Sequence, residues 1–282
     1  MQPVLRLIRV GNVAVSLAGT IVGGLAAAGG GVAHSTVFYA LLLLAALSTG
    51  FVTAGGNVLN DLLDVETDRV NHPDRPLVTG AISRTGGRTL AISMFVAGVA
   101  VAIPVVVTEP LVGLLLALAI GALLGYEFRL KAHGFAGNLT VAFLTGLVFL
   151  YGGAAAANAI IVAPFAVMAF LATLSREVIK DMEDAGGDTD RRTLPQTKGF
   201  EFATGLARGA VVIAIVLSFL PLVWFVRLDS AAGIMYLVLV LAADALFAVS
   251  VAQLPARLHW EQTVSKVAMS VALLAFLAVA FR

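Results

Sequence analysis

Residues 36–68 read TVFYALLLLAALSTGFVTAGGNVLNDLLDVETD, an apolar run that ends in a cluster of acidic residues. The apolar part exceeds the roughly 20 residues that an α-helix needs to cross a membrane. On one continuous helix, with about 100° per residue, four polar residues fall within about 60° of one another: Asn57, Asp61, Asp64 and Asp68. Three carboxylates on one face repel each other unless a cation lies among them. The stretch therefore predicts a membrane helix that leads into a divalent-metal site.

The composition of the 282-residue chain indicates a membrane protein. Hydrophobic residues make up 60% of it and charged residues only 12%, whereas soluble domains carry roughly 25% charged residues. The chain has no cysteine, which excludes disulfides, thiolate metal ligands and a cysteine nucleophile. Its four histidines are scattered and lack the spacing of a zinc site. The first apolar run continues past the length of a signal peptide, so it predicts a first transmembrane helix.

About nine apolar segments are long enough to span a bilayer. They cover residues 10–32, 36–60, 88–107, 111–128, 136–156, 160–180, 202–226, 231–252 and 264–281. Several are rich in glycine and alanine, and small residues let helices pack closely within lipid. We predict an all-α membrane protein in which about nine transmembrane helices form a pseudosymmetric bundle around a central cavity.

Lysine and arginine are distributed unevenly among the connections. All but Arg227 and Arg282 of these 18 residues lie in or beside the N-terminus and the connections expected on the same side. Positive residues are retained in the cytoplasm. We therefore predict a multi-pass protein of the cell membrane, with its N-terminus in the cytoplasm and its C-terminus outside. The two long polar connections, 61–87 and 181–200, would cap the cytoplasmic face and hold the active site.

The acidic cluster recurs in the second half of the chain. Asp61, Asp64 and Asp68 reappear 120 positions later as Asp181, Asp184 and Asp188. A polar loop that contains arginine and proline follows each triad. This pattern predicts two pseudo-repeats, roughly 36–107 and 160–226, within a single domain that spans 1–282. Their acidic faces would meet across the central cavity.

The residue types of the two clusters suggest a diphosphate site. A solvated loop explains one acidic run, but two runs with the same spacing at equivalent positions favour a function. All-oxygen ligands suit Mg²⁺, which commonly bridges carboxylates and substrate phosphates. Positive-inside bias explains many of the nearby bases, yet Lys180 lies beside Asp181 within the motif. Such a site fits the departure of pyrophosphate from an allylic diphosphate and the capture of the carbocation by a nucleophile.

Two motifs resemble those of a known family. Residues 57–68, with NHPDRPLVTGAIS from Asn71, resemble the first aspartate-rich motif of the UbiA superfamily of intramembrane prenyltransferases. SREVIKDMEDAGGD from Ser175 resembles the second motif, and the resemblance spans the whole chain. The second motif and LKAHGFAGN, residues 130–138, are most similar to the branch that makes archaeal ether lipids. That branch implies geranylgeranyl diphosphate as the isoprenoid donor and the free hydroxyl of geranylgeranylglyceryl phosphate as the lipid acceptor.

The resemblance also implies roles for individual residues. One Mg²⁺ would be held by Asn57, Asp61 and Asp68, with Asp64 nearby, and a second by Asp181, Asp184 and Asp188. Catalytic roles are expected for Asp61, Asp68, Asp181, Asp184 and Lys131. Arg176 stands where many relatives have tyrosine, so we expect it to offer a guanidinium to a phosphate on the acceptor.

Other residues are expected around the substrates. Those expected at the donor diphosphate or a substrate phosphate are Arg69, Arg75, Tyr126, Lys131, Arg176, Lys180, Arg192 and Lys198. Further candidates for substrate contact are Arg9, Asn12 and Asn138, although interfacial anchoring or helix capping also explains them. We expect the bilayer, the donor and the lipid acceptor as partners, with no nucleic acid and no obligate protein partner.

Two alternative functions stay open. A prenyltransferase for an aromatic or tetrapyrrole acceptor, such as a quinone or chlorophyll precursor, would use the same acidic clusters. A secondary transporter would also combine internal repeats with membrane acids. The acids here lie at one membrane face rather than in mid-span, and transport gives no reason for arginine-rich loops beside them.

Overall fold

The computed structural model describes residues 2–30, 35–185 and 193–282, which form helices joined by short connections. The long helices are α2 (Val10–Ala28), α3 (Thr36–Leu63), α5 (Arg84–Thr108), α6 (Pro110–Phe128), α7 (Phe135–Ala155), α8 (Ala163–Asp184), α10 (Phe200–Ser218), α12 (Ala231–Ala252) and α13 (Leu258–Ala278). The short ones are α1 (Gln2–Leu7), α4 (Val65–Asn71), η1 (Leu130–His133), α9 (Leu194–Lys198), α11 (Leu220–Trp224) and η2 (Val279–Phe281). These ranges contain no strand, so the predicted all-α class is confirmed.

Eight helical segments of the described chain are long and apolar enough to cross a membrane. They match eight of the predicted spans, with α10 and α11 together forming one of them. The remaining predicted span corresponds to α8, which carries Arg176, Glu177 and Lys180 in its second half. α8 nevertheless packs against α7 and α10 within the bundle. The chain is a multi-pass membrane protein, and the total of nine spans stays a prediction.

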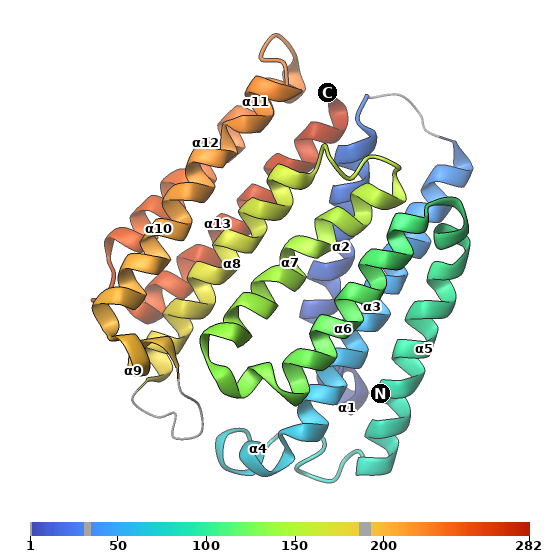
Figure 1. Ribbon diagram of the computed structural model, residues 1–282, viewed down its shortest axis with the longest axis vertical. Helices are drawn as coiled ribbons and strands as arrows, with labels where there is room; N and C mark the ends of the chain where they lie inside the picture. The colour runs from blue at the N-terminus through green and yellow to red at the C-terminus, as the bar shows by residue number, and fades with distance from the viewer. Residues whose placement is uncertain (1, 31–34, 186–192) are drawn as a thin grey trace.

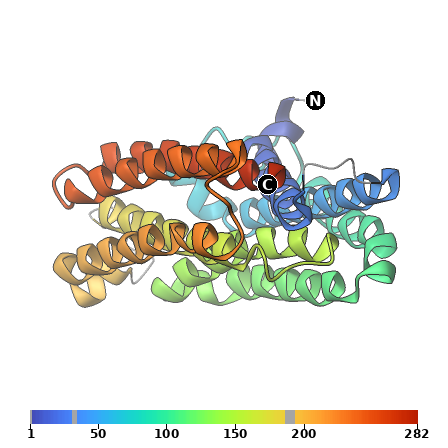
Figure 2. The same cartoon turned by 90° about the horizontal axis from the view of Figure 1, so that it is seen from above.

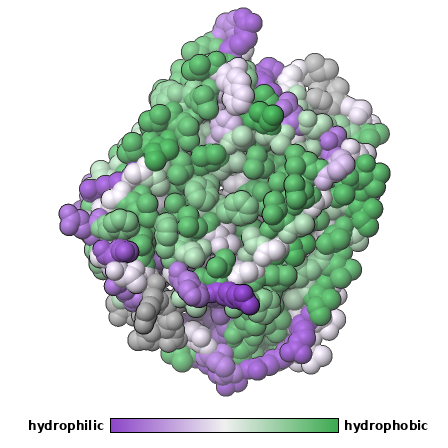
Figure 3. All heavy atoms as spheres, in the orientation of Figure 1, coloured by the Kyte–Doolittle hydropathy of each residue, from purple (hydrophilic) through white to green (hydrophobic). Residues whose placement is uncertain are grey.

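The outer surface of the bundle is apolar. Figure 3 shows hydrophobic residues across the middle of one face, with hydrophilic residues gathered mainly toward its edges. Large apolar side chains point outward from the middle of several helices, for example Val96 at 62% exposure and Val212 at 56%. An apolar surface of this size is unfavourable in contact with water. This surface therefore faces lipid.

The two polar connections lie at one end of the bundle. Figure 1 shows α4 and α9 at its lower end and the C-terminus at its upper end. Viewed from above, α12 and α13 lie on one side, and α5 and α6 on the other (Figure 2). The acidic motifs therefore share an end, as predicted. The capping role of the connections and the pseudo-repeats stay predictions.

Serine residues define where several helices begin. The hydroxyl of Ser35 accepts a hydrogen bond from the backbone nitrogen of Phe38 at 3.1 Å, and Ser83 accepts one from Gly86 at 3.0 Å. Such N-caps satisfy backbone donors that have no partner within the helix. They start α3 and α5, the two helices that flank the first polar connection.

Glycine brings α2 and α7 into close contact. A Cβ atom at Gly152 would meet the carbonyl oxygen of Thr20 at 2.0 Å, and one at Gly23 would meet that of Phe149 at 2.5 Å. Small residues allow helices to pack closely in a membrane, and at these two positions a Cβ atom would overlap the neighbouring backbone. Phe276 of α13 contacts the ring of Phe149 edge-on at 5.7 Å between centroids. The α2–α7 pair therefore forms a tightly packed centre to which α13 is added.

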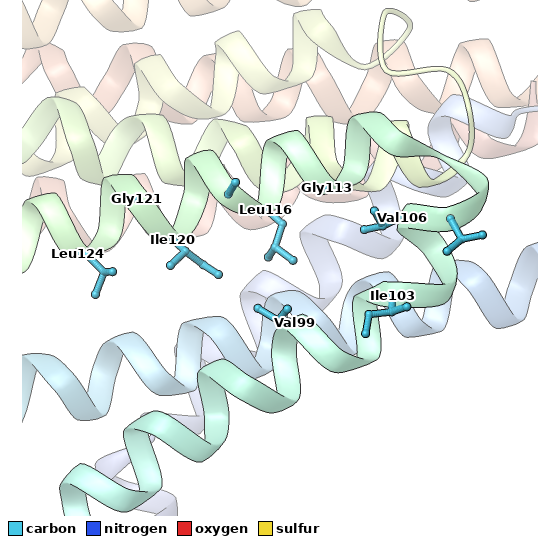
Figure 4. A pocket seen from close by; sticks show the side chains of 10 residues that line it. Val99, Ile103, Val106, Gly113, Leu116, Ile120, Gly121 and Leu124 are labelled. Atoms are coloured by element: carbon cyan, nitrogen blue, oxygen red, sulfur yellow. The ribbon is translucent and has the colours of Figure 1, made fainter.

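An apolar groove of about 600 Å³ runs between α5 and α6. Figure 4 shows the side chains of Val99 and Ile103 on α5, and of Leu116, Ile120 and Leu124 on α6, lining it. No polar side chain is among its ten lining residues. The groove lies beside the bundle core rather than between the acidic motifs. The central cavity predicted between those motifs is a separate feature and stays a prediction.

Asp244, an isolated acid within α12, joins two helices. The Ser218 hydroxyl of α10 donates to its carboxylate at 2.7 Å, and the Tyr236 hydroxyl donates to the Ser218 carbonyl at 2.7 Å. These bonds satisfy polar groups that lipid could not solvate. We therefore assign Asp244 a structural role in holding α10 against α12.

Candidate functional site

The first acidic cluster lies at the junction between α3 and α4. α3 ends at Leu63 and α4 begins at Val65, with Asp64 between them at φ −91° and ψ 5°. The prediction of one continuous helical face through Asp68 is therefore wrong. Aspartate is a poor residue for a helix interior, and the Asp64 carboxylate pairs with Lys131. The break at Asp64 redirects the chain before it reaches Asp68.

Asp61 and Asp68 converge despite this break. Both are buried, at 3% and 4% exposure. One nitrogen of the Arg75 guanidinium lies 3.1 Å from Asp61 and 2.5 Å from Asp68. Burial makes an unpaired carboxylate costly, so the shared arginine holds two acids from different helices together.

Arg9 approaches the same cluster from the junction of α1 and α2. Its guanidinium donates to Asp61 at 2.5 Å and to the side-chain oxygen of Asn60 at 3.0 Å. The backbone of Arg9 is left-handed, with φ 52°, a conformation that costs an L-residue about 1–2 kcal/mol. Backbone strain of this kind gathers at functional sites. Arg9 is thus placed in the site, whereas Asn12 is exposed on α2.

Asn57 lies one turn before Asp61 on α3. Its side-chain nitrogen donates to the carbonyl oxygen of Ile8 at 2.9 Å. This bond fixes the orientation of the amide, so its oxygen is the atom that could serve a cation. Asn57 and Arg9 both tie the N-terminal segment to the end of α3.

Glu127 is a site residue that the sequence analysis missed. It lies near the end of α6 with a side chain only 5% exposed, and the Lys131 ammonium is 3.6 Å away. The amide nitrogen of Asn60 donates to both Glu127 carboxylate oxygens, at 3.0 and 3.1 Å. Glu127 and Asp64 thus hold Lys131 between them. The i, i+4 spacing of Glu127 and Lys131 was a signal that could have revealed the pair.

The second acidic cluster occupies the last turns of α8. The side-chain nitrogen of Asn138, on α7, donates to the Asp181 carboxylate at 2.7 Å. Asp184, one turn further, is exposed. Arg176 donates to Glu177 at 2.9 Å. Asn138 therefore contacts the second acidic cluster, as expected of a site residue.

Two predicted site residues, Asp188 and Arg192, lie outside the described residues. Other predicted residues lie at the edge of the site. Arg69 pairs with Glu66 at 3.0 Å on the outer face of α4 and is 60% exposed, and Lys180 and Lys198 are also exposed. Tyr126 is half-buried beside Gly137, where a Cβ atom would meet its ring at 3.4 Å.

The segment from α6 to α7 connects the two clusters. Lys131 in η1 pairs with Asp64 of the first cluster, and Asn138 in α7 bonds Asp181 of the second. Seven positions separate these two contacts in sequence. Their proximity fixes both acidic clusters at the same end of the bundle, so a single substrate could contact both.

The donor set fits a hard divalent cation. In the ranges that the structure describes, no three His, Cys, Asp or Glu side chains converge closely enough to form a ready-made metal site. Basic residues neutralise the acids instead: Arg9 and Arg75 at Asp61, and Lys131 at Asp64. The available ligands are carboxylate and amide oxygens, which suit Mg²⁺ brought in with a phosphate group better than a closed protein cage.

Comparison with known proteins identifies the family. The sequence matches the UbiA prenyltransferase family over residues 16–280. The chain belongs to the UbiA prenyltransferase family. It is therefore a prenyltransferase, and the transporter alternative is wrong.

Individual relatives of this UbiA prenyltransferase support the assignment. The digeranylgeranylglyceryl phosphate synthase of Methanopyrus kandleri is 37% identical over 291 residues, with 99% of each chain covered. That of Methanoculleus marisnigri is 42% identical over 181 residues, which span 61% of this chain and 64% of that protein. A solved structure of a digeranylgeranylglyceryl phosphate synthase has a TM-score of 0.81 at 29% identity, covering 99% of this chain and 98% of that one.

A more distant solved structure has the same fold. It is a UbiA homologue from Archaeoglobus fulgidus bound to GPP and Mg²⁺, with a TM-score of 0.70 at 18% identity and 99% of each chain covered. The helical bundle of this UbiA prenyltransferase is thus that of the solved members. The predicted fold and family are confirmed.

We predict that Glu127→Gln weakens binding of the prenyl diphosphate. Lys131 would lose one of its two anionic neighbours and be less firmly held, and partners that orient a ligating group typically contribute about 10- to 100-fold. We expect KM for the donor to rise about tenfold and kcat to change less, measured at saturating acceptor. Glu109→Gln, at the opposite end of α6, is the matched control. An unchanged donor KM in Glu127→Gln would show that Lys131 does not depend on Glu127.

Proposed function

We propose that this protein is a Mg²⁺-dependent prenyltransferase that moves a geranylgeranyl group from geranylgeranyl diphosphate to the free hydroxyl of geranylgeranylglyceryl phosphate. Diphosphate is released, and the product carries two ether-linked chains, as in archaeal membrane lipids. The observation that carries the proposal is the pairing of two acidic clusters through one basic segment, residues 126–138. Support also comes from the relatives described above, one of which matches over nearly the whole chain and is named digeranylgeranylglyceryl phosphate synthase.

In this proposal the carboxylates hold the metal. Asp61 and Asp68, with Asn57, would hold one Mg²⁺, and Asp181 and Asp184 a second. Asp64 and Asp188 belong to the predicted sets as well. When bound, the metal would neutralise charge on the diphosphate as it leaves.

The basic residues would act on the donor diphosphate directly. Lys131 and Arg75 already lie against the acids. A metal-bound phosphate at these acids could therefore accept hydrogen bonds from both side chains. As the allylic C–O bond breaks, the bonding electrons leave with the diphosphate, and these donors stabilise the growing negative charge. Tyr126 would line the same space, and Arg69, Lys180, Arg192 and Lys198 would attract the anion from the outer edge.

The acceptor hydroxyl then attacks the allylic carbon, forms the new C–O bond and transfers its proton to the released diphosphate. Water would capture the same carbocation, so the reaction needs a dry site. Asp61 and Asp68 are almost fully buried, and the surrounding bundle is apolar. Arg176 would bind the phosphate of the acceptor, which an aromatic acceptor lacks.

We also propose that the site faces the cytoplasm. The bases at the α4 and α9 end of the bundle support this orientation. Because the chain has no cysteine, a single cysteine introduced at exposed Asp74 can be labelled in intact and in opened cells. We expect a membrane-impermeant maleimide to label Asp74→Cys only after opening. Labelling of intact cells would reverse the orientation.

Purified protein with radiolabelled geranylgeranyl diphosphate and Mg²⁺ tests the function. Separate reactions receive geranylgeranylglyceryl phosphate, a quinone precursor or a chlorophyll precursor as acceptor. We expect a labelled diether lipid in the first reaction only, with release of one diphosphate per product. Product in either other reaction and none in the first would replace the proposed acceptor with an aromatic or tetrapyrrole one.

A further inference from the structure

A second groove, of about 440 Å³, lies beside the first turns of α10. α10 begins two residues after α9 ends, so the groove lies at the end of the bundle that carries the acidic motifs. Its lining residues are Phe200, Glu201, Thr204, Gly205 and Arg208, together with Pro255 beyond the end of α12. None of them has a role in the proposed reaction, so this groove needs a separate explanation.

Arg208 is the basic residue of the groove. Its Nε–H group donates to the carbonyl oxygen of Val251 at 3.1 Å, and its Nη2 group donates to that of Leu254 at 2.7 Å. These bonds fix the guanidinium against the end of α12, but both acceptors are neutral. In the part of the chain that the structure describes, Arg208 forms no ion pair. A charged side chain on a membrane helix is expected to have a partner, so this guanidinium is available to an anion.

Thr204 lies one turn before Arg208 and lines the same groove. It is only 7% exposed, and its hydroxyl is buried without a hydrogen-bond partner among the described residues. A threonine within a helix commonly donates to a carbonyl one turn earlier, but this one does not. A buried polar group without a partner is unfavourable, and an acceptor oxygen in the groove would supply one.

Glu201 places an acid nearer the end of the bundle. Glu201, Thr204 and Arg208 are spaced i, i+3 and i+7, so they lie along one face of α10. Glu201 is exposed in the first turn, and Arg208 lies about 10 Å further along the helix axis. From the polar end of the bundle toward its apolar middle, the groove thus presents an acid, a hydroxyl and then a base.

We propose that this groove binds the headgroup of a membrane phospholipid that carries an amine, with the phosphate held by Arg208 and Thr204 and the ammonium group by Glu201. In a bilayer, such a lipid has its ammonium group nearer the water and its phosphate nearer the hydrocarbon, which is the order of charge that the groove complements. A free phosphate ion would be repelled by Glu201 and would leave the apolar surface of Phe200 and Pro255 uncovered. The proposed lipid lies outside the catalytic site, and its binding does not depend on the proposed function.

Arg208 also has a structural role, because it donates to carbonyl groups at the end of α12. Arg208→Gln would therefore lower the unfolding temperature whether or not a lipid binds. A binding site adds stabilisation that depends on the lipid concentration, so each variant is compared with and without lipid. Arg88→Gln is the matched control, since Arg88 is an exposed arginine near the start of α5, at the same end but outside the groove.

The test titrates the purified full-length protein, in lipid-free detergent, with phosphatidylethanolamine or phosphatidylglycerol. Native mass spectrometry measures the bound lipid, and the unfolding temperature is recorded in parallel. We expect wild type to prefer phosphatidylethanolamine, because phosphatidylglycerol lacks the ammonium group. Arg208→Gln should weaken binding of phosphatidylethanolamine about 10- to 100-fold, as expected for lost hydrogen bonds to a charged group. Glu201→Gln should weaken it about two- to fivefold, the effect of one exposed ion pair.

Reversing the acid gives a second readout that does not disturb the end of α12. Glu201→Lys should reverse the preference, so that phosphatidylglycerol binds more tightly than phosphatidylethanolamine. Binding of phosphatidylethanolamine by Arg208→Gln as tight as by wild type, or an unchanged lipid preference in Glu201→Lys, would overturn the proposal. Inorganic phosphate is titrated separately. If it raises the unfolding temperature as much as phosphatidylethanolamine does, and Arg208→Gln abolishes both effects, the ligand is a free anion and not a lipid.

Discussion

Asp61→Asn will lower kcat for prenyl transfer by about 10³-fold, a loss typical of removing a group that stabilises charge in the transition state. Asparagine keeps the shape of the side chain but removes the negative charge that two arginines share. Asp61 contacts both Arg9 and Arg75 and is almost fully buried. The variant would hold the metal poorly and would orient both guanidinium groups poorly. The rate is measured at saturating donor, acceptor and Mg²⁺.

Asp74→Asn is the matched control for this change. Asp74 also pairs with an arginine, Arg6, but both side chains are mostly exposed, at 71% and 59%. Exposed ion pairs contribute roughly 0–1 kcal/mol, so we expect nearly normal activity. Asp181→Asn, in the second cluster, should resemble Asp61→Asn. Full activity in both Asp61→Asn and Asp181→Asn would refute the metal assignment while leaving the family assignment intact.

We expect Arg75→Gln to lower the free energy of unfolding of the metal-free protein. Arg75 bridges Asp61 and Asp68, which lie side by side and buried. Removing the one base that they share leaves two acids to repel each other, and breaking a buried ion pair costs about 3–5 kcal/mol. We expect a lower unfolding temperature for the metal-free variant than for wild type, followed by fluorescence of the two tryptophans.

Mg²⁺ should then stabilise Arg75→Gln more than it stabilises wild type. In the variant the cation would replace the missing charge, whereas in wild type it must compete with the guanidinium. Arg84→Gln is the control, because Arg84 pairs with the exposed Glu66 at 2.5 Å. Equal Mg²⁺-induced shifts in the unfolding temperature of Arg75→Gln and wild type would show that the metal binds elsewhere.

Sequence patterns were sufficient to predict the helical architecture and to locate the two acidic motifs. Apolar runs of sufficient length can hardly be anything but helices in lipid, so eight of the predicted spans coincide with apolar helices of the structure. The two acidic motifs were found by their repeated spacing. Their position at a shared end followed from the alternation of basic connections.

The partners of the acids could not be predicted in the same way. Arg69 and Arg75 look equivalent in the sequence, yet the helix break at Asp64 turns Arg69 outward and leaves Arg75 facing the site. At that break Asp64 pairs with Lys131, which is distant in sequence. The spacing of Glu127 and Lys131 was a signal for one contact of Glu127, but its second partner, Asn60, is distant in sequence and could not be predicted.

The central claim is that the acidic clusters of α3–α4 and α8 together hold the metal-bound diphosphate of the donor. An experimental structure with Mn²⁺ in place of Mg²⁺ and a non-hydrolysable geranylgeranyl diphosphate analogue tests it directly, since Mn²⁺ can be located by its anomalous scattering. We predict metal within coordinating distance of Asp61 and Asp68 on one side and of Asp181 on the other, with the diphosphate beside Lys131. A diphosphate bound without metal, or one located away from both clusters, would contradict the account.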